Sequence, residues 1–286
     1  MTWRETISKA AGFLEAKGVP DAPSAAEFLA ARLLGTGRGF LAAAFESEPE
    51  ERHIAAMRRG MARLVRGEPV QYVIGEWDFR SLTLKCDPRA LIPRPETEQL
   101  VTRVLSWLRK TADGSRRLVL DVGTGTGAIA LSIAAETGGD VTVLATDVSG
   151  PAVDLARENA ERCGLSGKVR FAVMDGLDDF DEPGLASAIV SNPPYVETAV
   201  CETLDPRVKD HEPRIALDGG KTGLDFYERY LADALHVLKP GGAVFFEIGE
   251  TQGAALRSMM QAYGFESVRV ERDFAGNDRY ASAELP

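Results

Sequence analysis

The sequence predicts an α/β protein, in which helices cover a mostly parallel β-sheet with an antiparallel strand at its edge, preceded by a small helical N-terminal domain. From residue 116 onward, short apolar runs alternate with amphipathic stretches, which is typical of a parallel sheet with helices on both faces. The last two strand-like runs, Ser267–Arg272 and Arg279–Ala283, have no helix between them, so we expect them to pair antiparallel. Residues 1–75 instead carry apolar side chains at helical spacing.

Three amphipathic helices are expected within residues 1–75. Thr2 with Glu5, and Ser24 with Glu27, have the spacing of a capping box, in which two side chains satisfy free N–H groups at a helix start. The apolar stripes of the three helices are Ile7, Ala10, Ala11 and Leu14, then Phe28, Ala31 and Leu34, and then Ile54, Met57, Met61, Leu64 and Val65. This segment is therefore predicted to be a helical domain of its own.

The charge is unevenly distributed along the chain. The 286 residues include 33 basic and 43 acidic ones, a net charge of −10. Residues 1–75 hold 10 of the basic and 9 of the acidic residues, so nearly all the negative charge follows them. A strongly acidic chain is a poor candidate for long contacts with nucleic-acid phosphates. Four arginines are expected along one face of the third helix, either as a solvated face or as a docking site for an acidic or nucleic-acid-bearing partner: Arg58, Arg59, Arg63 and Arg66.

Cysteine and histidine usage predicts neither disulfides nor a metal site. Cys86, Cys163 and Cys201 are far apart and form no CxxC pair, which fits a reducing cytoplasm. The three histidines are too scattered for a metal triad. No run approaches the ~20 apolar residues of a membrane span, and the N-terminus lacks the apolar core of a signal peptide. We therefore expect a cytoplasmic protein without metal or membrane.

A β-hairpin linker is predicted over residues 76–95. Its first half alternates apolar and polar side chains, with Arg80 and Ser81 at the expected turn. Two prolines then exclude a regular element, and a helix is expected to begin near Glu96. The predicted domains are therefore residues 1–75, the linker 76–95, and residues 96–286.

The domain over residues 96–286 is predicted to alternate strands and helices. The expected strands are Leu118–Leu120, Val141–Ala145, Val169–Val173, Ala188–Val190 and Ala243–Ile248, followed by the antiparallel pair. The expected helices are Ala128–Ala135, Ala152–Cys163 and Phe226–Leu238. The stretch Val196–Thr222 shows no clear element. Because long loops in compact domains are often functional, it is a candidate cover for a substrate.

A glycine-rich turn follows the first of these strands and opens the next helix. Glycines allow a sharp turn and a close approach of the backbone to a ligand. In sheets of this kind, ligands bind at the carboxyl ends of the strands. The turn therefore predicts a nucleotide-like cofactor, bound by Asp121, Gly123, Thr124, Gly125, Thr126 and Gly127.

Three acidic residues near this turn are candidate cofactor ligands. Asp147 ends the second strand, roughly 20 residues further on, where a carboxylate can accept hydrogen bonds from both ribose hydroxyls. Asp175 follows the third strand and is placed to meet the base of such a cofactor. If the cofactor is S-adenosylmethionine, Asp121 is placed to face its amino-acid end. The turn also satisfies G-x-G-x-x-A, so NAD is an alternative cofactor, and a tight turn without a ligand is another.

The sequence Asn192-Pro193-Pro194-Tyr195 directly follows the fourth strand. Two prolines fix φ twice and remove two backbone donors, so the turn is expected to be rigid. It holds two acceptors, the side-chain oxygen of Asn192 and the carbonyl of Pro193, which match the two donors of a planar –NH2 group. Tyr195 is expected to stack on the flat face of that group. These features favour S-adenosylmethionine over NAD.

This arrangement suits methyl transfer to an amide or exocyclic amine nitrogen. Such a nitrogen is a weak nucleophile because its lone pair is delocalised. Accepting hydrogen bonds from both of its N–H groups raises its electron density and aims it at a sulfonium methyl. Positioning then supplies much of the rate. No strong base is needed, since the methylated nitrogen can lose its proton to water.

These motifs resemble those of amino-methyltransferases that act on planar –NH2 groups, and the whole chain is similar to the release factor glutamine methyltransferase (HemK/PrmC) family. The Asn-Pro-Pro-Tyr motif and four further stretches carry the likeness, which extends essentially from end to end. The four are Pro69–Gly75, Leu91–Glu98 (Leu-Ile-Pro-Arg-Pro-Glu-Thr-Glu), Glu212–Leu217 and Asp273–Arg279.

The resemblance implies a class I, Rossmann-like methyltransferase. It implies S-adenosylmethionine-dependent N5-methylation of the glutamine in the Gly-Gly-Gln motif of peptide chain release factors, a step in translation termination. It also implies that Gly123–Gly127 and Asp147 bind the cofactor and that Asn192–Tyr195 hold the glutamine amide. Related enzymes can place an aromatic residue beside the aspartate at the base. Here Gly176 follows Asp175, so the stacking on adenine must come from elsewhere.

Two further residues are candidates for binding the substrate. They are Arg94, which either holds the substrate segment or pins the linker, and Glu212. The expected partners are release factors, recognised by residues 1–75, with no membrane and no sequence-specific nucleic acid, and the expected state is a monomer.

Three rival functions fit parts of the same pattern. The first is an adenine-N6 DNA or RNA methyltransferase, because an exocyclic amine fits the same two acceptors. The second is a NAD-dependent oxidoreductase on the same type of sheet. The third is a non-catalytic binding module that uses the N-terminal helices.

Overall fold

The computed structural model of the protein describes residues 1–178, 180 and 182–286. The chain forms two compact units. The first consists of Met1–Trp77 and Asp205–His211, and the second of Asp78–Leu204 and Glu212–Pro286. A short segment far along the chain thus belongs to the N-terminal unit, a feature absent from the predicted division into residues 1–75, 76–95 and 96–286. The role of each predicted domain stays a prediction.

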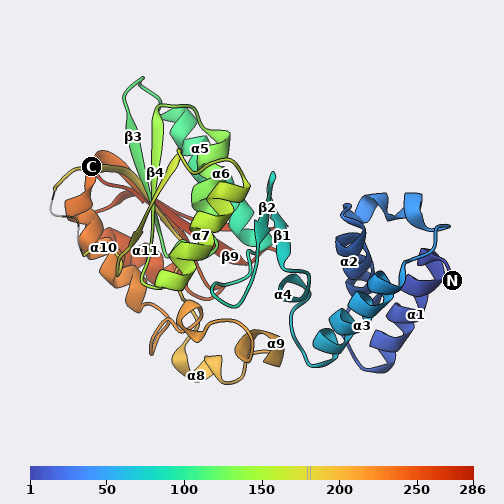
Figure 1. Ribbon diagram of the computed structural model, residues 1–286. Helices are drawn as coiled ribbons and strands as arrows, with labels where there is room; N and C mark the ends of the chain where they lie inside the picture. Colours follow the sequence, from blue (N-terminus) through green and yellow to red (C-terminus); the bar gives the residue numbers. More distant parts are fainter. Residues whose placement is uncertain (179, 181) are drawn as a thin grey trace. The chain divides into compact units, whose positions relative to one another are not determined.

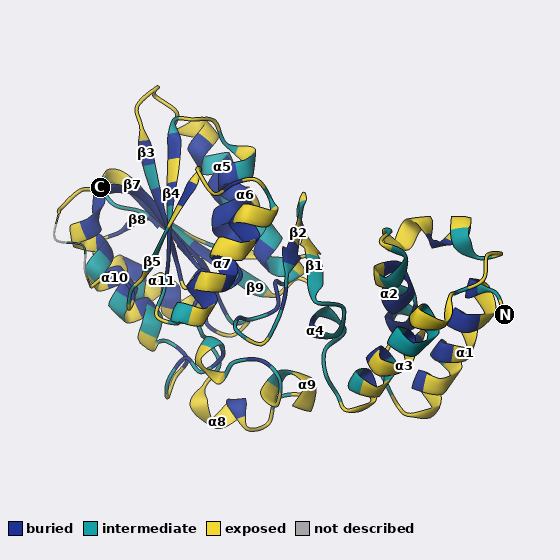
Figure 2. Cartoon of the chain, viewed as in Figure 1, coloured by how far each residue is buried: buried dark blue, intermediate teal, exposed yellow. Residues whose placement is uncertain are grey.

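The first unit is built from helices. They are α1 (Trp3–Ala16), α2 (Ala22–Leu34), the 3-10 helix η1 (Arg38–Ala44), α3 (Glu51–Val65), α4 (Val70–Ile74) and α9 (Pro206–Lys209). Apolar side chains of α1, α2 and α3 form its core, among them Trp3, Leu14 and Leu29. Buried segments recur along α1 and α2 (Figure 2). The predicted capping box of α1 is confirmed: the Glu5 N–H donates to the Thr2 hydroxyl at 3.3 Å, and the Thr2 N–H donates to the Glu5 carboxylate at 3.1 Å.

The capping box predicted at Ser24 and Glu27 is wrong. α2 already begins at Ala22, because Pro23 suits the first turn of a helix, where an N–H has no helical partner. Ser24 and Glu27 therefore lie inside the helix, and both accept hydrogen bonds from Arg38 of η1, at 3.1 and 2.5 Å. The buried face also differs from the predicted stripe, since it consists of Ala22, Ala25, Ala26, Leu29, Ala30 and Ala31.

One of the four arginines predicted along α3 has a structural role. Arg63 forms an ion pair with Glu68 and donates hydrogen bonds to the carbonyls of Tyr72, at 3.0 Å, and Val73, at 3.1 Å. It therefore fixes α4 against the end of α3. The other three arginines are exposed, so the choice between a solvated face and a docking site concerns them alone.

The predicted hairpin is confirmed. β1 (Glu76–Phe79) and β2 (Leu82–Lys85) form a two-stranded sheet, with Arg80 at the turn in the left-handed region at φ 53°. The Arg80 guanidinium donates to the Glu98 carbonyl at 2.7 Å and to the Glu136 carboxylate at 2.8 Å. These bonds hold the strained turn in place.

The second unit contains a seven-stranded sheet in the order β5-β4-β3-β6-β7-β9-β8. Figure 1 shows this sheet with helices packed beside it. The strands are β3 (Arg117–Val122), β4 (Val141–Asp147), β5 (Val169–Val173), β6 (Ala186–Ser191), β7 (Leu238–Glu247), β8 (Glu266–Arg272) and β9 (Asp278–Glu284). The first five in the order are parallel, and β9 is antiparallel to both of its neighbours. The predicted sheet with an antiparallel edge is confirmed.

Helices cover both faces of this sheet. One apolar core joins it to α5 (Pro95–Lys110), α6 (Ala128–Glu136) and α7 (Gly150–Arg162). A second core joins it to α10 (Asp225–Val237) and α11 (Gly253–Ala262). Every residue of the central strand β6 is buried, as expected for a strand covered on both sides. The strand order reverses between β3 and β6, and such a reversal opens a crevice at the carboxyl ends of the strands.

The sequence pattern missed several helices. Of α11, only Gly253, Leu256 and Met260 are buried, too few to stand out as a stripe. The stretch predicted to lack regular elements contains three helices of at most four residues: α8 (Thr198–Cys201), α9, and the 3-10 helix η2 (Arg214–Ala216). Such short segments have no periodicity to detect.

Candidate active site

A cavity of about 400 Å³ opens at the carboxyl ends of the parallel strands, within the second unit. It lies at the reversal of strand order, where α/β sheets bind their ligands. It brings together segments that are far apart in the chain: the glycine turn, the ends of β4, β5 and β6, the segment before α5, the loop after Glu212, and α10. We refer to it as the main cavity.

The glycine turn borders the main cavity through Gly123, Thr124, Gly125 and Thr126. Gly125 has φ +55° and donates its N–H to the Asp147 carboxylate at 2.9 Å, so it links the turn to the end of β4. Gly127 has φ +83°, and a Cβ there would lie 3.2 Å from the Cβ of Ala156 in α7. The last glycine is therefore required by helix packing, and the first two by the course of the turn beside the cavity.

Asp121 does not line the main cavity, contrary to the expectation that it faces the cofactor. It is completely buried beneath the turn. One carboxylate oxygen accepts hydrogen bonds from the Thr124 hydroxyl at 2.6 Å and from the Ala130 N–H at 3.1 Å. The other has no hydrogen-bond partner among the described residues. Burial raises the pKa of Asp121 to about 7. Its evident role is to tie the turn to the start of α6.

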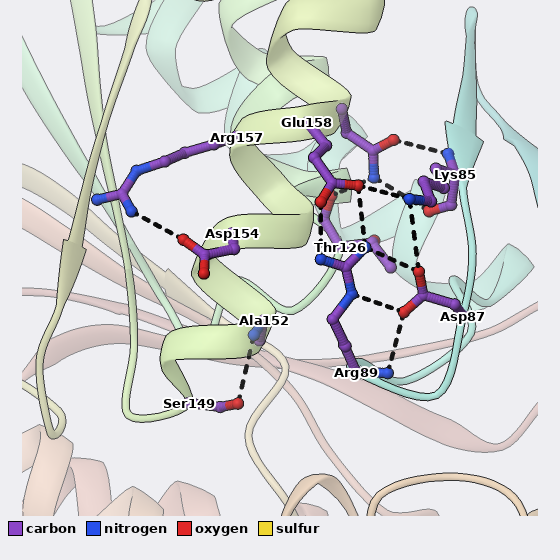
Figure 3. A network of polar contacts seen from close by, with 10 residues as sticks. Lys85, Asp87, Arg89, Thr126, Ser149, Ala152, Asp154, Arg157 and Glu158 are labelled. Carbon is purple, nitrogen blue, oxygen red and sulfur yellow. Dashed lines mark hydrogen bonds and ion pairs between the residues drawn. The ribbon is translucent and has the colours of Figure 1, made fainter.

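Asp147 lies where the sequence places it, at the end of β4 on the wall of the main cavity. Its two oxygens accept hydrogen bonds from the N–H groups of Gly125 and Ser149, each at 2.9 Å. Each oxygen keeps a further lone pair, so the carboxylate can still accept from a vicinal pair of hydroxyls. Burial raises the pKa of Asp147. Ser149 in turn caps α7 through the Ala152 N–H (Figure 3).

Asp175 and Gly176 also line the main cavity, but the Asp175 side chain already has a partner. Arg229 of α10 donates to its carboxylate at 2.8 Å and to the Asp178 carboxylate at 2.6 Å. A Cβ on Gly176 would lie 3.0 Å from a ring carbon of Tyr230. The glycine therefore makes room for an aromatic side chain of α10.

The sequence has no aromatic residue next to Asp175, but α10 supplies two aromatic residues that line the same cavity. Phe226 and Tyr230 both line the main cavity, with ring centroids 6.0 Å apart. The sequence reasoning missed them, although their spacing of four residues puts them on one helix face. They are the candidates for stacking on a planar base.

One wall of the main cavity is the segment from Arg89 to Arg94, held by charged side chains (Figure 3). Arg89 donates to both oxygens of Glu158 in α7, at 2.8 and 2.9 Å, and to Asp87 at 2.8 Å. Lys85 also reaches Glu158, at 2.7 Å. Hydrogen bonds from Arg89 and Lys85 lower the pKa of Glu158 to about 2. This network fixes the segment to α7.

Glu212 and Arg94 form an ion pair at 2.5 Å. The Glu212 carboxylate is buried, does not line the cavity, and also accepts the Ile92 N–H at 3.0 Å. Glu212 therefore orders the wall segment, contrary to the expectation that it contacts substrate. Arg94 does line the cavity, and its ion pair favours the pinning role for this residue. The loop after Glu212 closes the cavity through Pro213, Ile215 and Ala216.

Only part of the Asn-Pro-Pro-Tyr turn faces the main cavity. Asn192 and Pro194 line it, whereas Pro193 and Tyr195 do not. Tyr195 packs against the second core, and its carbonyl accepts a hydrogen bond from the Gln252 side chain at 3.0 Å. Burial raises the pKa of the Tyr195 hydroxyl to about 12. In this structure the Tyr195 ring packs against the second core, so its stacking on the target group stays a prediction.

The fold and this cavity define a class I S-adenosylmethionine-dependent methyltransferase. The solved structure of the delta-N METTL16 MTase domain has the same fold, with a TM-score of 0.52 and 19% identity over 71% of this chain and 88% of that one. Two family descriptions match the chain: "PrmC N-terminal domain" over residues 5–75 and "Methyltransferase small domain" over residues 101–205.

Curated relatives match nearly the whole chain. The release factor glutamine methyltransferase of Bacillus anthracis is 34% identical over 98% of each chain. That of Moorella thermoacetica is 38% identical over 98% of this chain and 97% of its own. The human MTRF1L release factor glutamine methyltransferase is 35% identical over 96% of this chain and 85% of its own. The chain belongs to the release factor glutamine methyltransferase family.

S-adenosylmethionine is accordingly the cofactor of this enzyme, and the residues around the main cavity fit it. Asp147 offers two acceptors for ribose hydroxyls, α10 offers aromatic rings for adenine, and the glycine turn allows close approach. Among the described residues, no cluster of side chains could hold a metal ion. Within the same residues, no helix is both long and apolar enough to cross a membrane.

Replacing Phe226 by Ala is expected to weaken the binding of S-adenosylhomocysteine about tenfold, since an aromatic stacking partner is worth about 0.5–1.5 kcal/mol beyond its buried area. Isothermal titration calorimetry measures the effect. Phe274→Ala is the matched control, because the Phe274 side chain is 94% exposed and lies outside the cavity. Equal affinities for both variants would show that the adenine ring is held elsewhere.

Proposed function

We propose that this enzyme transfers a methyl group from S-adenosylmethionine to N5 of the glutamine in the Gly-Gly-Gln motif of peptide chain release factors, in the cytoplasm. Membership of the family supports the substrate class. The observation that carries the proposal is the position of Asn192, which lines the same cavity as the glycine turn and Asp147. A group that accepts hydrogen bonds from an amide thus borders the space for the methyl donor.

The chemistry follows from the acceptors of the Asn-Pro-Pro-Tyr turn. In the proposed complex, the Asn192 side-chain oxygen accepts one N–H group of the glutamine amide. The carbonyl of Pro193, in the peptide bond to the cavity-lining Pro194, accepts the other. Both bonds increase the electron density on the nitrogen, and together they aim its lone pair. The bound cofactor supplies an electrophilic methyl group. The enzyme's contribution is mainly orientation, which can supply ~7–11 kcal/mol of the barrier. The amide proton leaves to water.

We assign recognition of the release factor to the helical unit, residues 1–75, and the methyl transfer to residues 96–286. The protein acts as a monomer in this proposal. The exposed arginines Arg58 and Arg59 on α3, and Arg66 directly after it, offer a basic surface to a protein partner. Sequence-specific binding of nucleic acid has no part in it, because the chain carries a net charge of −10.

The proposal is tested with methyl-labelled S-adenosylmethionine and a purified release factor, beside a release factor in which the Gly-Gly-Gln glutamine is replaced by alanine. Label on the first factor alone, with mass spectrometry placing it on the glutamine N5, is the expected result. Label on both factors would move the site elsewhere in the factor. Label on DNA or RNA supplied in its place would support the adenine-N6 function.

A further inference from the structure

Three side chains from distant parts of the chain form a hydrogen-bonded row beside the main cavity, which Asn192 and Thr97 both line. Asn192 follows β6, Thr97 lies in the first turn of α5, and Glu247 ends β7. The Asn192 side-chain nitrogen lies 3.2 Å from the Thr97 hydroxyl, which lies 2.7 Å from the Glu247 carboxylate. Thr97 is 5% exposed and Glu247 is 2% exposed, so water does not compete for these bonds.

The number of protons in this row sets the direction of each hydrogen bond. An ionised carboxylate only accepts, so the single hydroxyl proton of Thr97 is donated to Glu247. The Thr97 oxygen can then only accept a further hydrogen bond. It accepts this bond from the –NH2 group of the Asn192 amide. An asparagine side chain has its nitrogen and oxygen on opposite sides of one carbon atom. With the nitrogen bound to Thr97, the oxygen points the other way.

We propose that Thr97 and Glu247 are positioning residues, which hold the Asn192 amide with its oxygen toward the main cavity, ready to accept an N–H of the glutamine substrate. The inference rests on the proposed function, because it gives Asn192 the part of acceptor for an amide. Without the row, the amide could rotate by half a turn. It would then present N–H donors to an amide nitrogen that itself carries donors, and the two groups would repel.

Further hydrogen bonds hold the backbone at Glu247, which ends the row, and beside Thr97, which is its middle member. The Tyr227 hydroxyl donates to the Glu247 carbonyl at 2.8 Å, which holds the end of β7. The Tyr280 hydroxyl donates to the Glu96 carbonyl at 2.8 Å, which holds the first turn of α5. The backbone at Glu247 and next to Thr97 is therefore held in place. The two side chains that orient Asn192 accordingly have fixed positions.

The row needs Glu247 in its ionised form. A protonated Glu247 would donate to the Thr97 oxygen, and Thr97 could then donate its own proton to the Asn192 oxygen. Both hydrogen bonds would run in the opposite direction, and the Asn192 amide would be turned around. Burial raises the pKa of Glu247 to about 7, while the Thr97 hydrogen bond acts in the opposite sense. The charged and titratable groups that act on Glu247, or are acted on by it, are Arg279, Glu96, Arg94, Tyr195, Tyr227 and Tyr280. We therefore expect kcat to fall as the pH is lowered through about 7.

The test compares Thr97→Val, which keeps the shape of the side chain but has no hydroxyl, with Thr97→Ser, which keeps the hydroxyl. Wild-type methylation of the release factor is established first, so a failure of the proposed function is seen separately. Thr97→Val is expected to lower kcat more than about tenfold, with KM for the release factor changed by less than about threefold. Thr97→Ser should retain most of the wild-type kcat.

Folding of each variant is checked by circular dichroism and by calorimetry with S-adenosylhomocysteine, which does not require the acceptor amide. Thr111→Val, an exposed threonine near the other end of α5, is the matched control. A kcat of folded Thr97→Val equal to that of the wild type would overturn the proposal. So would a Thr97→Ser variant as inactive as Thr97→Val.

Glu247→Gln provides an independent test that does not depend on Thr97. A glutamine does not titrate, so the part of the decrease in kcat between pH 8 and pH 6 that Glu247 causes should disappear in this variant. Asp121, whose pKa is also raised to about 7 by burial, is present in both proteins, so any contribution from it remains in both profiles. An unchanged acidic limb in Glu247→Gln would show that Glu247 does not act through ionisation and would overturn its proposed part.

Discussion

Asn192→Ala is expected to lower kcat for methyl transfer at least about 100-fold, the usual effect of removing one group that is preorganised around a reacting centre. The substitution removes the side-chain oxygen that is proposed to accept an N–H of the substrate glutamine. The amide nitrogen of that glutamine is then no longer oriented toward the methyl group. Binding of S-adenosylhomocysteine should change by less than about threefold, because Asp147 and the glycine turn are untouched. The measurements are single-turnover transfer of labelled methyl to a release factor and calorimetry with S-adenosylhomocysteine.

Asn277→Ala is the matched control for this substitution, because Asn277 is exposed on the loop between β8 and β9 and does not line the main cavity. It should have wild-type kcat. If Asn192→Ala turned over at the wild-type rate, the proposed role of Asn192 would be refuted. If it lost cofactor binding as well, its effect would be on the shape of the cavity and not on the acceptor amide.

Gly223→Ala is expected to destabilise the protein by about 2–3 kcal/mol and to lower kcat more than about tenfold. Gly223 has φ +69°, and a Cβ there would lie 2.3 Å from the Tyr195 carbonyl oxygen and 2.7 Å from the Gln252 side-chain nitrogen. That nitrogen holds the carbonyls of Tyr195 and Gly223, each at 3.0 Å. The added methyl group must displace the Asn-Pro-Pro-Tyr turn, so activity falls together with stability.

Gly264→Ala separates the two causes, because Gly264 has φ +84° and nothing lies within 4 Å of its added Cβ. This control should be destabilised only by the left-handed backbone of an L-residue, about 1–2 kcal/mol, with an unchanged kcat. Urea denaturation and the methyl-transfer assay measure both variants. Equal losses of stability in the two variants, with normal activity in each, would contradict the predicted steric effect on the turn.

Local patterns were sufficient to predict most of the fold. Short apolar runs and helical apolar spacing predicted the strands of the sheet and the helices α6, α7 and α10, whereas α11 was missed. The antiparallel edge followed from the absence of a helix between β8 and β9. The glycine turn, Asp147 and Asn192 were also predicted to lie together, since the carboxyl ends of parallel strands meet at one edge of the sheet.

The same local reasoning does not fix the direction of a side chain that has two possible neighbours. Asp121 and Tyr195 belong to motifs beside the cavity, yet Asp121 is buried under the turn and Tyr195 packs into the second core. A motif fixes the residue type and the backbone position, but the direction of the side chain depends on which space the surrounding elements leave. Glu212 is a further case, because its partners Ile92 and Arg94 lie about 120 residues earlier in the chain.

By itself, the sequence determined the class of fold, the position of the glycine turn at the end of β3, and the rigid turn after β6, because each depends on short-range spacing and on the backbone limits of glycine and proline. Only the tertiary structure decided that Phe226 and Tyr230 border the cavity beside Gly176. It also decided that Thr97 and Glu247, 150 residues apart, meet behind Asn192. The physical reason is that such contacts are set by the packing of helices on the sheet, which no local pattern encodes.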